Sequence, residues 1–255
     1  MKLGIVTYQI AKDWDVPTLI DMCQKIGLQG VELRTTHAHG VEIDLTADQR
    51  QGVKQQFADA GVEIVGLGSA FEYHAVEPET VKQNIDGTVE YARLAADLGC
   101  PGVKVRPNGL QVDRGIPAEK TLEQIGLALR ECGQSAADLG VEIRLEVHGR
   151  ETSNPKHMRT IIDHADHDNV YICWNSNPAG ETINGSIKEN FDLLKHKLSL
   201  VHINELHRAE YPWRELFALL KAENYTGYTL AEIPDSPEPE RLLRYYKALW
   251  EAYTA

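Results

Sequence analysis

The sequence predicts an α/β protein with the (β/α)8 TIM barrel fold, built as a single domain over residues 1–255. Such a barrel typically takes roughly 250 residues, which is close to the length of this chain. Gly27, Gly61, Gly99 and Gly140 recur at spacings of 34 to 41 residues, the size of one strand–helix unit. Polar residues also alternate with apolar ones along several expected strands, as the inner wall of a barrel requires.

A weak internal repeat gives the order of the strands and helices. Segments 25–33, 59–67, 97–105 and 138–145 each combine a helix end, a glycine and an apolar strand. The glycine suits the left-handed position that closes a helix. We expect strands near residues 3–8, 30–34, 62–67, 102–106, 141–148, 169–174, 199–204 and 227–232, with helices between them and after the last.

Local signals support several helices and locate the ligand-binding end of the barrel. Thr46 and Gln49 have the spacing of a capping box, and the last helix is expected at about 239–253. The connections that follow strands are longer than those that precede them. In α/β folds the ligand site lies at the C-terminal ends of the strands, so we expect the site among these connections. The longer connections are residues 107–117, 149–154, 175–186, 204–212 and 234–239.

The alternation of polar and apolar residues predicts which side chains face the barrel axis. Successive strand residues point to opposite faces, and the outer face of a barrel must be apolar because helices cover it. Buried charges must then be paired, bound to metal or solvated. The polar residues expected to face inward are Glu32, Arg34, Lys104, Arg106, Glu146, His148, His202 and Asn204.

Four side chains at strand ends could hold a divalent metal ion. Glu146, His202 and Glu232 offer two carboxylates and an imidazole, and Asn175 offers an amide oxygen. Such an ion would polarise a carbonyl group and stabilise an enediolate as the neighbouring C–H proton leaves. Glu146 and Glu232 are the candidate catalytic residues, because two glutamates across a sugar carbon could remove and return that proton.

Each of these assignments has a structural alternative. The two glutamates could form ion pairs with Lys104 or Arg106, and the histidine could be a core residue with its hydrogen bonds satisfied. Asn175 is a neutral and weaker ligand, so it could lie behind the ligands or belong to a simple asparagine-rich loop. Asn177, two residues further along the chain, is then the alternative candidate for the metal ligand in this segment.

Further polar side chains near the same strand ends are candidate substrate contacts. Lys104 and Arg106 could hold an anionic or hydroxylated substrate, although charge balance for the glutamates is an equal alternative. His74 follows the third strand and could reach the mouth of the barrel. The full candidate set is Lys104, Arg106, His148, Glu32, Arg34, His74 and Asn177.

Composition and charge argue against several classes of partner. A net charge of −12 disfavours nucleic acid, whose phosphate backbone normally requires basic patches. No stretch approaches the roughly 20 apolar residues of a membrane span. The four cysteines are scattered and form no C-x-x-C pair, which is typical of reduced core thiols in a cytoplasmic protein.

The order of the motifs resembles the sugar phosphate isomerases and epimerases of the xylose isomerase-like TIM barrel superfamily. The resemblance covers essentially the whole chain and is carried by segments 30–33, 145–148, 173–175, 201–203, 225–228 and 231–233. It implies a divalent ion (Mn, Mg, Co or Zn) held by Glu146, the sixth-strand residue, His202 and Glu232, the glutamates also forming the acid/base pair. The sixth-strand ligand of the family is usually aspartate, and this chain has Asn175 there.

The resulting hypothesis is a metal-dependent isomerase or epimerase of a small sugar, sugar acid or sugar phosphate, with a carbohydrate as its small-molecule partner. One alternative is a barrel that binds a sugar or polyol without turnover, which the weaker ligand at Asn175 motivates. Another is a related polyol dehydratase, which shares the step of proton abstraction. Relatives often pair, so a homodimer is one state open to this chain.

Overall fold

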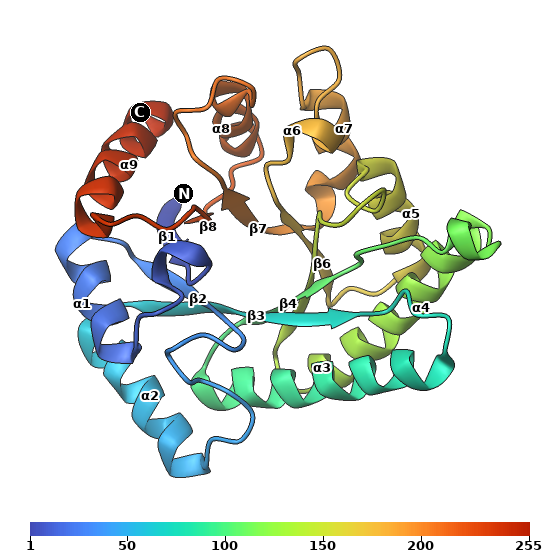
Figure 1. Ribbon diagram of the computed structural model, residues 1–255, viewed down its shortest axis with the longest axis horizontal. Helices are drawn as coiled ribbons and strands as arrows, with labels where there is room; N and C mark the ends of the chain where they lie inside the picture. The colour runs from blue at the N-terminus through green and yellow to red at the C-terminus, as the bar shows by residue number, and fades with distance from the viewer.

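The computed structural model describes all residues 1–255 and shows a closed barrel of eight parallel strands. Each strand pairs with the next along the chain, and β8 closes the cylinder by pairing with β1 (Figure 1). Helices surround the barrel, which confirms the predicted (β/α)8 fold. The strands are β1 (Lys2–Val6), β2 (Gly30–Arg34), β3 (Glu63–Glu72), β4 (Gly102–Arg106), β5 (Glu142–Glu146), β6 (Val170–Trp174), β7 (Leu198–Ile203) and β8 (Tyr228–Ala231).

The helices cover the outside of the barrel in chain order (Figure 1). Three short 3-10 turns, η1 (Gln9–Ala11), η2 (Val112–Arg114) and η3 (Lys195–Lys197), lie in the connections. None of the helices is both long enough and apolar enough to span a membrane. The helices are α1 (Val16–Ile26), α2 (Ala47–Ala60), α3 (Pro78–Leu98), α4 (Ala118–Ala137), α5 (Pro155–Ala165), α6 (Pro178–Glu181), α7 (Lys188–Leu194), α8 (Trp213–Ala222) and α9 (Pro239–Thr254).

Two apolar clusters hold the layers together. The larger contains 59 buried residues and joins the outer faces of the strands to the helices. The smaller contains six residues from alternate strand positions, among them Val65, Leu200 and Leu230. Because neighbouring strand residues point to opposite faces, this second cluster fills the interior of the barrel and supports the polar layer near its mouth. The four cysteines are free and buried, as the sequence predicted.

The local signals read from the sequence correspond to real helix ends. Thr46 and Gln49 form both hydrogen bonds of a capping box at the start of α2. Gly27 closes α1 with a φ of 78°, a left-handed conformation that favours glycine. The chain therefore turns within two or three residues into the next strand, which keeps this end of the barrel compact.

β3 and β5 differ most in length from the prediction. β3 continues to Glu72, because Glu72 pairs with Arg106 of β4 after an irregularity in register. β5 ends at Glu146, because the chain turns at Gly149, where φ is 94°. An added Cβ at Gly149 would lie 2.2 Å from the carbonyl oxygen of Asn108. His148 therefore belongs to the loop after β5 and not to the strand.

A buried hydrogen-bond chain fixes the connection after β6. Trp174 donates from Nε1 to the Tyr211 hydroxyl over 2.7 Å, and Tyr211 donates to Oε2 of Glu181 over 2.7 Å. Asn190 donates from its side chain to the Glu181 carbonyl oxygen over 2.9 Å. Burial raises the pKa of the Glu181 carboxyl group to about 8. The carboxyl group is therefore largely neutral at neutral pH and ties α6 and the β7–α8 connection to the end of β6.

The raised pKa of Glu181 predicts a pH-dependent stability. The pKa of Glu181 is about 8 in the folded protein, above the ordinary 4.5. The neutral carboxyl group therefore stabilises the folded protein fully below about pH 4.5. That contribution declines, by up to about 1.4 kcal/mol per pH unit, as the pH rises to about 8. We expect Glu181→Gln to flatten the free energy of unfolding against pH over this range, as measured by urea denaturation. Glu189→Gln, at an exposed position on α7, should keep the wild-type slope; equal slopes in all three proteins would contradict the assignment.

Candidate active site

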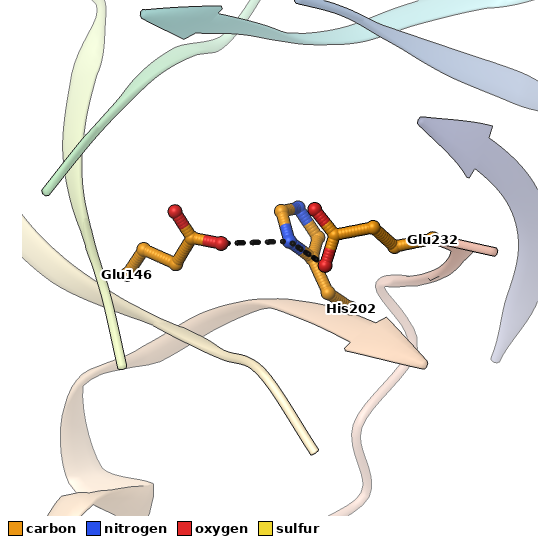
Figure 2. Close-up of side chains that lie close together, drawn as sticks. All are labelled: Glu146, His202 and Glu232. Atoms are coloured by element: carbon orange, nitrogen blue, oxygen red, sulfur yellow. Dashed lines mark ion pairs between the residues drawn. The ribbon is translucent and has the colours of Figure 1, made fainter. Parts of the chain in front are cut away.

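The imidazole of His202, on β7, lies among three carboxylates from three other parts of the barrel. Its Nε2 is 3.2 Å from Oε2 of Glu32 on β2. Its Nδ1 is 3.4 Å from Oε1 of Glu146 on β5 and 3.6 Å from Oε2 of Glu232, which follows β8 (Figure 2). Strands distant in sequence therefore deliver these groups to one point, because closure of the barrel brings their ends together.

The Nδ1 atom of His202 is buried and has no hydrogen-bond partner. If Nε2 donates its proton to Glu32, the lone pair of Nδ1 faces two carboxylates. That arrangement is repulsive unless a positive charge lies between them, either a proton on Nδ1 or a metal ion. Burial opposes protonation, but the Cys173 sulfur and the carboxylates of Glu32 and Glu232 raise the pKa of His202 well above its ordinary value.

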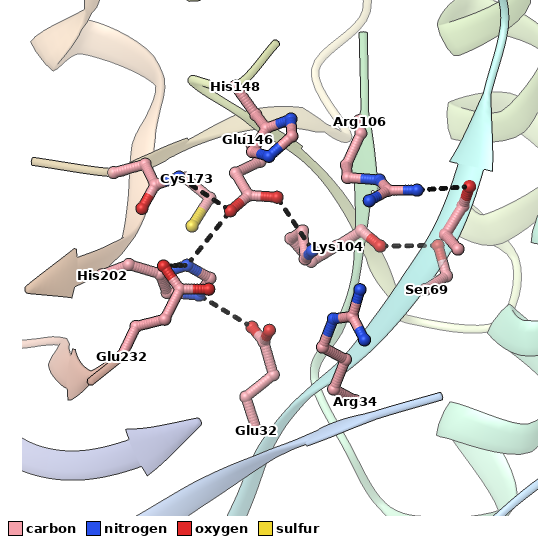
Figure 3. Close-up of polar contacts among 12 residues, drawn as sticks. Glu32, Arg34, Ser69, Lys104, Arg106, Glu146, His148, Cys173, His202 and Glu232 are labelled. Carbon is pink, nitrogen blue, oxygen red and sulfur yellow. Dashed lines mark hydrogen bonds and ion pairs between the residues drawn. The ribbon is translucent and has the colours of Figure 1, made fainter. Parts of the chain in front are cut away.

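Glu146 has partners for both carboxylate oxygens. Lys104 Nζ lies 2.8 Å from Oε2 (Figure 3). Asn175 donates from Nδ2 to Oε1 over 2.9 Å. Burial disfavours the charged carboxylate, yet Lys104 and His202 hold the pKa of Glu146 well below its ordinary value. Burial likewise opposes the charge on Lys104, but Glu146 and Glu32 raise the pKa of the ammonium group. Both members of the pair are therefore ionised at neutral pH.

The donor set fits a divalent cation. Glu146, His202 and Glu232 each present one ligand atom, and these atoms lie within 4.8 Å of one another. Two carboxylates and an imidazole suit a borderline metal, and the unpartnered Nδ1 is the atom that would bind it. Asn175 contacts the same Glu146 oxygen as His202, but it does so through its amide nitrogen, which donates a hydrogen bond and does not bind a metal ion. Glu146 would have to share its two oxygens between Lys104 and the ion.

A cavity of about 230 Å³ opens over these groups. It contains candidates from both the metal-binding and the substrate-binding predictions, and its wall is mostly polar. The lining residues are Tyr8, Arg34, Lys104, Arg106, Glu146, His148, Asn175, Asn177, Asn204 and Glu232.

Two predicted substrate contacts lie elsewhere. Glu32 is completely buried on the far side of His202, so it can orient the imidazole but does not line the cavity. His74 lies beside Glu72, with Nδ1 3.6 Å from Oε2, and outside the cavity wall. The extension of β3 explains this position, because it carries the chain past the mouth before His74 is reached.

Tyr8 and Asn204 line the cavity without having been assigned a role from the sequence. Tyr8 follows β1 by two residues, and Asn204 follows β7 directly. Their positions just beyond the ends of strands were a usable signal, because side chains there reach the mouth of a barrel. Asn204 also belongs to the inward-facing row that the alternation predicted.

Comparison with known proteins places this architecture in a family. A model for the xylose isomerase-like TIM barrel matches residues 20–249. The chain belongs to this family. A search of curated protein sequences finds no match. The assignment to the family therefore rests on the family model, which matches most of the chain, and on the barrel fold.

Solved structures of similar shape support the same fold. A D-psicose 3-epimerase from Clostridium cellulolyticum H10, solved with D-tagatose, has a TM-score of 0.85 at 16% identity, covering 100% of this chain and 99% of that one. A 3-keto-D-glucoside 4-epimerase from E. coli has a TM-score of 0.80 at 17% identity, with 99% of both chains covered. The IOLI protein, solved with a bound zinc atom, has a TM-score of 0.76 at 16% identity, covering 100% and 98%.

Within this xylose isomerase-like barrel, the identity of residue 175 should control metal affinity. Asn175→Asp adds a carboxylate beside Glu146 and His202, so we expect Mn²⁺ or Zn²⁺ to bind at least about tenfold more tightly, or about 1.4 kcal/mol, by calorimetry. Asn177→Asp is the matched control, because Asn177 lines the same cavity but donates to the Val147 carbonyl oxygen. Unchanged affinity in Asn175→Asp, or an equal gain in both variants, would show that residue 175 does not reach the ion.

Proposed function

We propose that the protein is a divalent-metal-dependent isomerase or epimerase acting on a small sugar, sugar acid or sugar phosphate. The observation that carries the proposal is the cluster of Glu146, His202 and Glu232, whose ligand atoms lie within 4.8 Å of one another. Glu146 and Glu232 also line the polar cavity. Two carboxylates beside a metal-binding histidine are suited to moving a proton at carbon next to a carbonyl group.

The proposed roles follow from the contacts of each residue. A divalent ion held by Glu146, His202 and Glu232, with Asn175 beside them, would polarise a substrate carbonyl and so acidify the neighbouring C–H bond. Glu32 orients His202 by accepting from Nε2, which directs Nδ1 toward the two catalytic candidates. Glu232 has a side chain that is 14% exposed, against 2% for Glu146, so Glu232 is the more accessible of the two to substrate.

Lys104 has a separate role in this proposal. Its ammonium group keeps Glu146 ionised and restricts the carboxylate to one orientation. An ionised carboxylate can accept a proton from a C–H bond, whereas a neutral one cannot. Glu146 and Glu232 then act as base and acid in turn, one removing the proton and the other returning it.

The structural neighbours support the same class of reaction. Two of them are described as sugar epimerases, and a third was solved with zinc. The near-complete coverage of both chains means that this chain and the two epimerases are of comparable length.

A second candidate function is the binding of a sugar or polyol without turnover. The observation that favours it is the complete pairing of Glu146, one oxygen with Lys104 and the other with Asn175. A carboxylate engaged in this way is a weaker metal ligand and a weaker base. Chelation separates the two functions, because a metal-independent binding protein keeps its affinity for sugar when EDTA is added.

Solvent deuterium exchange tests the proposed chemistry. In D2O with Mn²⁺, the wild-type protein should incorporate deuterium at a carbon next to the carbonyl of a ketose or ketose phosphate, followed by NMR. We expect Glu146→Gln and Glu232→Gln each to lower the exchange rate by at least about 10²-fold, since each removes a proton-transfer group.

Glu151→Gln is the matched control, because Glu151 lies in the exposed part of the loop after β5 on the same side of the barrel. Its exchange rate should equal that of the wild type. Undiminished exchange in both site variants would overturn the acid/base pair. Mass spectrometry of the product separates an isomer from the dehydrated product that a lyase would release.

A further inference from the structure

The wall of the cavity has an excess of positive charge in a protein that is strongly acidic. The chain has 38 acidic and 26 basic residues, apart from histidine, and a net charge of −12. The cavity, by contrast, is lined by three cationic side chains, Arg34, Lys104 and Arg106, and two anionic ones, Glu146 and Glu232. A bound divalent ion would increase this local excess further. The local charge is therefore the reverse of what the composition alone would give.

Arg34 is the cation without a compensating carboxylate. It follows Leu33 at the end of β2, is half-buried and makes no ion pair in the structure. Its Nη1 donates to Nε2 of His37 over 3.3 Å, and its guanidinium group lies 5.8 Å from the centre of the Tyr8 ring. The contact with His37 requires a neutral imidazole, because a guanidinium group is always protonated and can only donate. The positive charge of Arg34 is therefore left for a ligand.

The surroundings of Arg34 hold it in place. His37 Nδ1 lies 3.0 Å from the Thr7 hydroxyl, and the Thr7 hydroxyl also accepts from the backbone nitrogen of Arg34 over 2.9 Å. Burial lowers the pKa of His37, and the charge of Arg34 adds to this effect. A neutral histidine thus orients the arginine without neutralising it.

Arg106 supplies a second guanidinium group on the same side of the cavity. Its Nη2 lies 2.8 Å from Oε1 of Glu72 and 3.2 Å from the Ala70 carbonyl oxygen. Its Nε is buried and has no hydrogen-bond partner. In Figure 3 the guanidinium groups of Arg34 and Arg106 lie across the site from His202 and Glu232. Lys104 is already paired with Glu146, and Arg106 shares Nη2 with Glu72, so Arg34 is the cation without a carboxylate partner and Arg106 can add only its remaining N–H groups.

We propose that Arg34 and Arg106 form an anion subsite, and that the substrate is a short hydroxycarbonyl compound bearing a carboxylate or phosphate group. The anionic end would lie on the two arginines and the reacting carbons beside Glu146 and Glu232. This inference rests on the proposed isomerase or epimerase function and narrows its substrate class.

Charge and size both favour such a substrate over a neutral one. Guanidinium groups bind carboxylate and phosphate through paired, charge-assisted hydrogen bonds, whereas a neutral sugar would leave the charge of Arg34 uncompensated. The cavity of about 230 Å³ is below the roughly 300–1,000 Å³ of pockets for drug-sized ligands, so it fits one small molecule.

Calorimetry with three non-reacting probes tests the anion subsite. Erythritol, D-erythronate and erythritol 4-phosphate have the same number of carbons, and none has the ketone or aldehyde group that the reaction requires. In the Mn²⁺-loaded wild type we expect at least one of the two anions to bind at least about tenfold more tightly than erythritol. The stronger anion shows whether the natural group is a carboxylate or a phosphate.

Arg34→Gln should abolish this preference while changing the affinity for erythritol less than about twofold. Arg34→Lys keeps the charge and should retain part of the preference, which guards against a general loss of structure in the glutamine variant. Arg150→Gln is the control, since Arg150 is an exposed arginine in the loop after β5 and does not line the cavity. It should keep the full preference.

Equal affinity for all three probes in the wild type, or a full anion preference in Arg34→Gln, would overturn the proposal. These results are independent of the deuterium exchange test. Exchange with no anion preference would refute the anion subsite alone, and anion preference with no exchange would refute the proton transfer alone.

Discussion

The arrangement of three carboxylates around one buried imidazole determines the properties of the whole site. Glu32 approaches one nitrogen of His202, and Glu146 and Glu232 approach the other. Like charges cannot be held this close in a buried layer without cations between them. Lys104 supplies one fixed cation, and the remaining charge requires either a proton on the imidazole or a metal ion. This need for a compensating cation arises from closure of the barrel, because closure brings the ends of β2, β5, β7 and β8 together.

In the proposed function the cavity has two halves with different roles. The half formed by β5, β7 and the segment after β8 concentrates ligands for a cation and groups that can move protons. The half formed by β2 and β4 carries arginines that can bind an anion. Lys104 lies between the two halves and neutralises the charge of Glu146. The arginines of the second half are therefore not needed to compensate Glu146. A substrate with a carbonyl group at one end and a negative charge at the other would contact both halves.

The alternation of residues along the strands was sufficient to predict the barrel and much of the cavity wall. Side-chain direction depends on the two-residue period of a strand, which is visible in the sequence around Glu146, His202 and Arg34. Depth along the barrel axis is set by the stagger of the strands and was not visible, so Glu32 lies behind His202 and not at the cavity. The length of β3 depends on pairing with β4, which places His74 outside the cavity. The sequence also left open whether Lys104 contacts substrate or Glu146, because only the fold gives their separation of 2.8 Å.

Anomalous diffraction from crystals soaked in Mn²⁺ tests the central claim most directly. The account predicts one strong peak at ligand distance, about 2.0–2.2 Å, from Nδ1 of His202 and from carboxylate oxygens of Glu146 and Glu232. A peak bound by other residues, or no peak there at saturating Mn²⁺ with Lys104 still paired to Glu146, would contradict it. In the latter case a proton on His202 would balance the carboxylates, and the site would work without a metal ion.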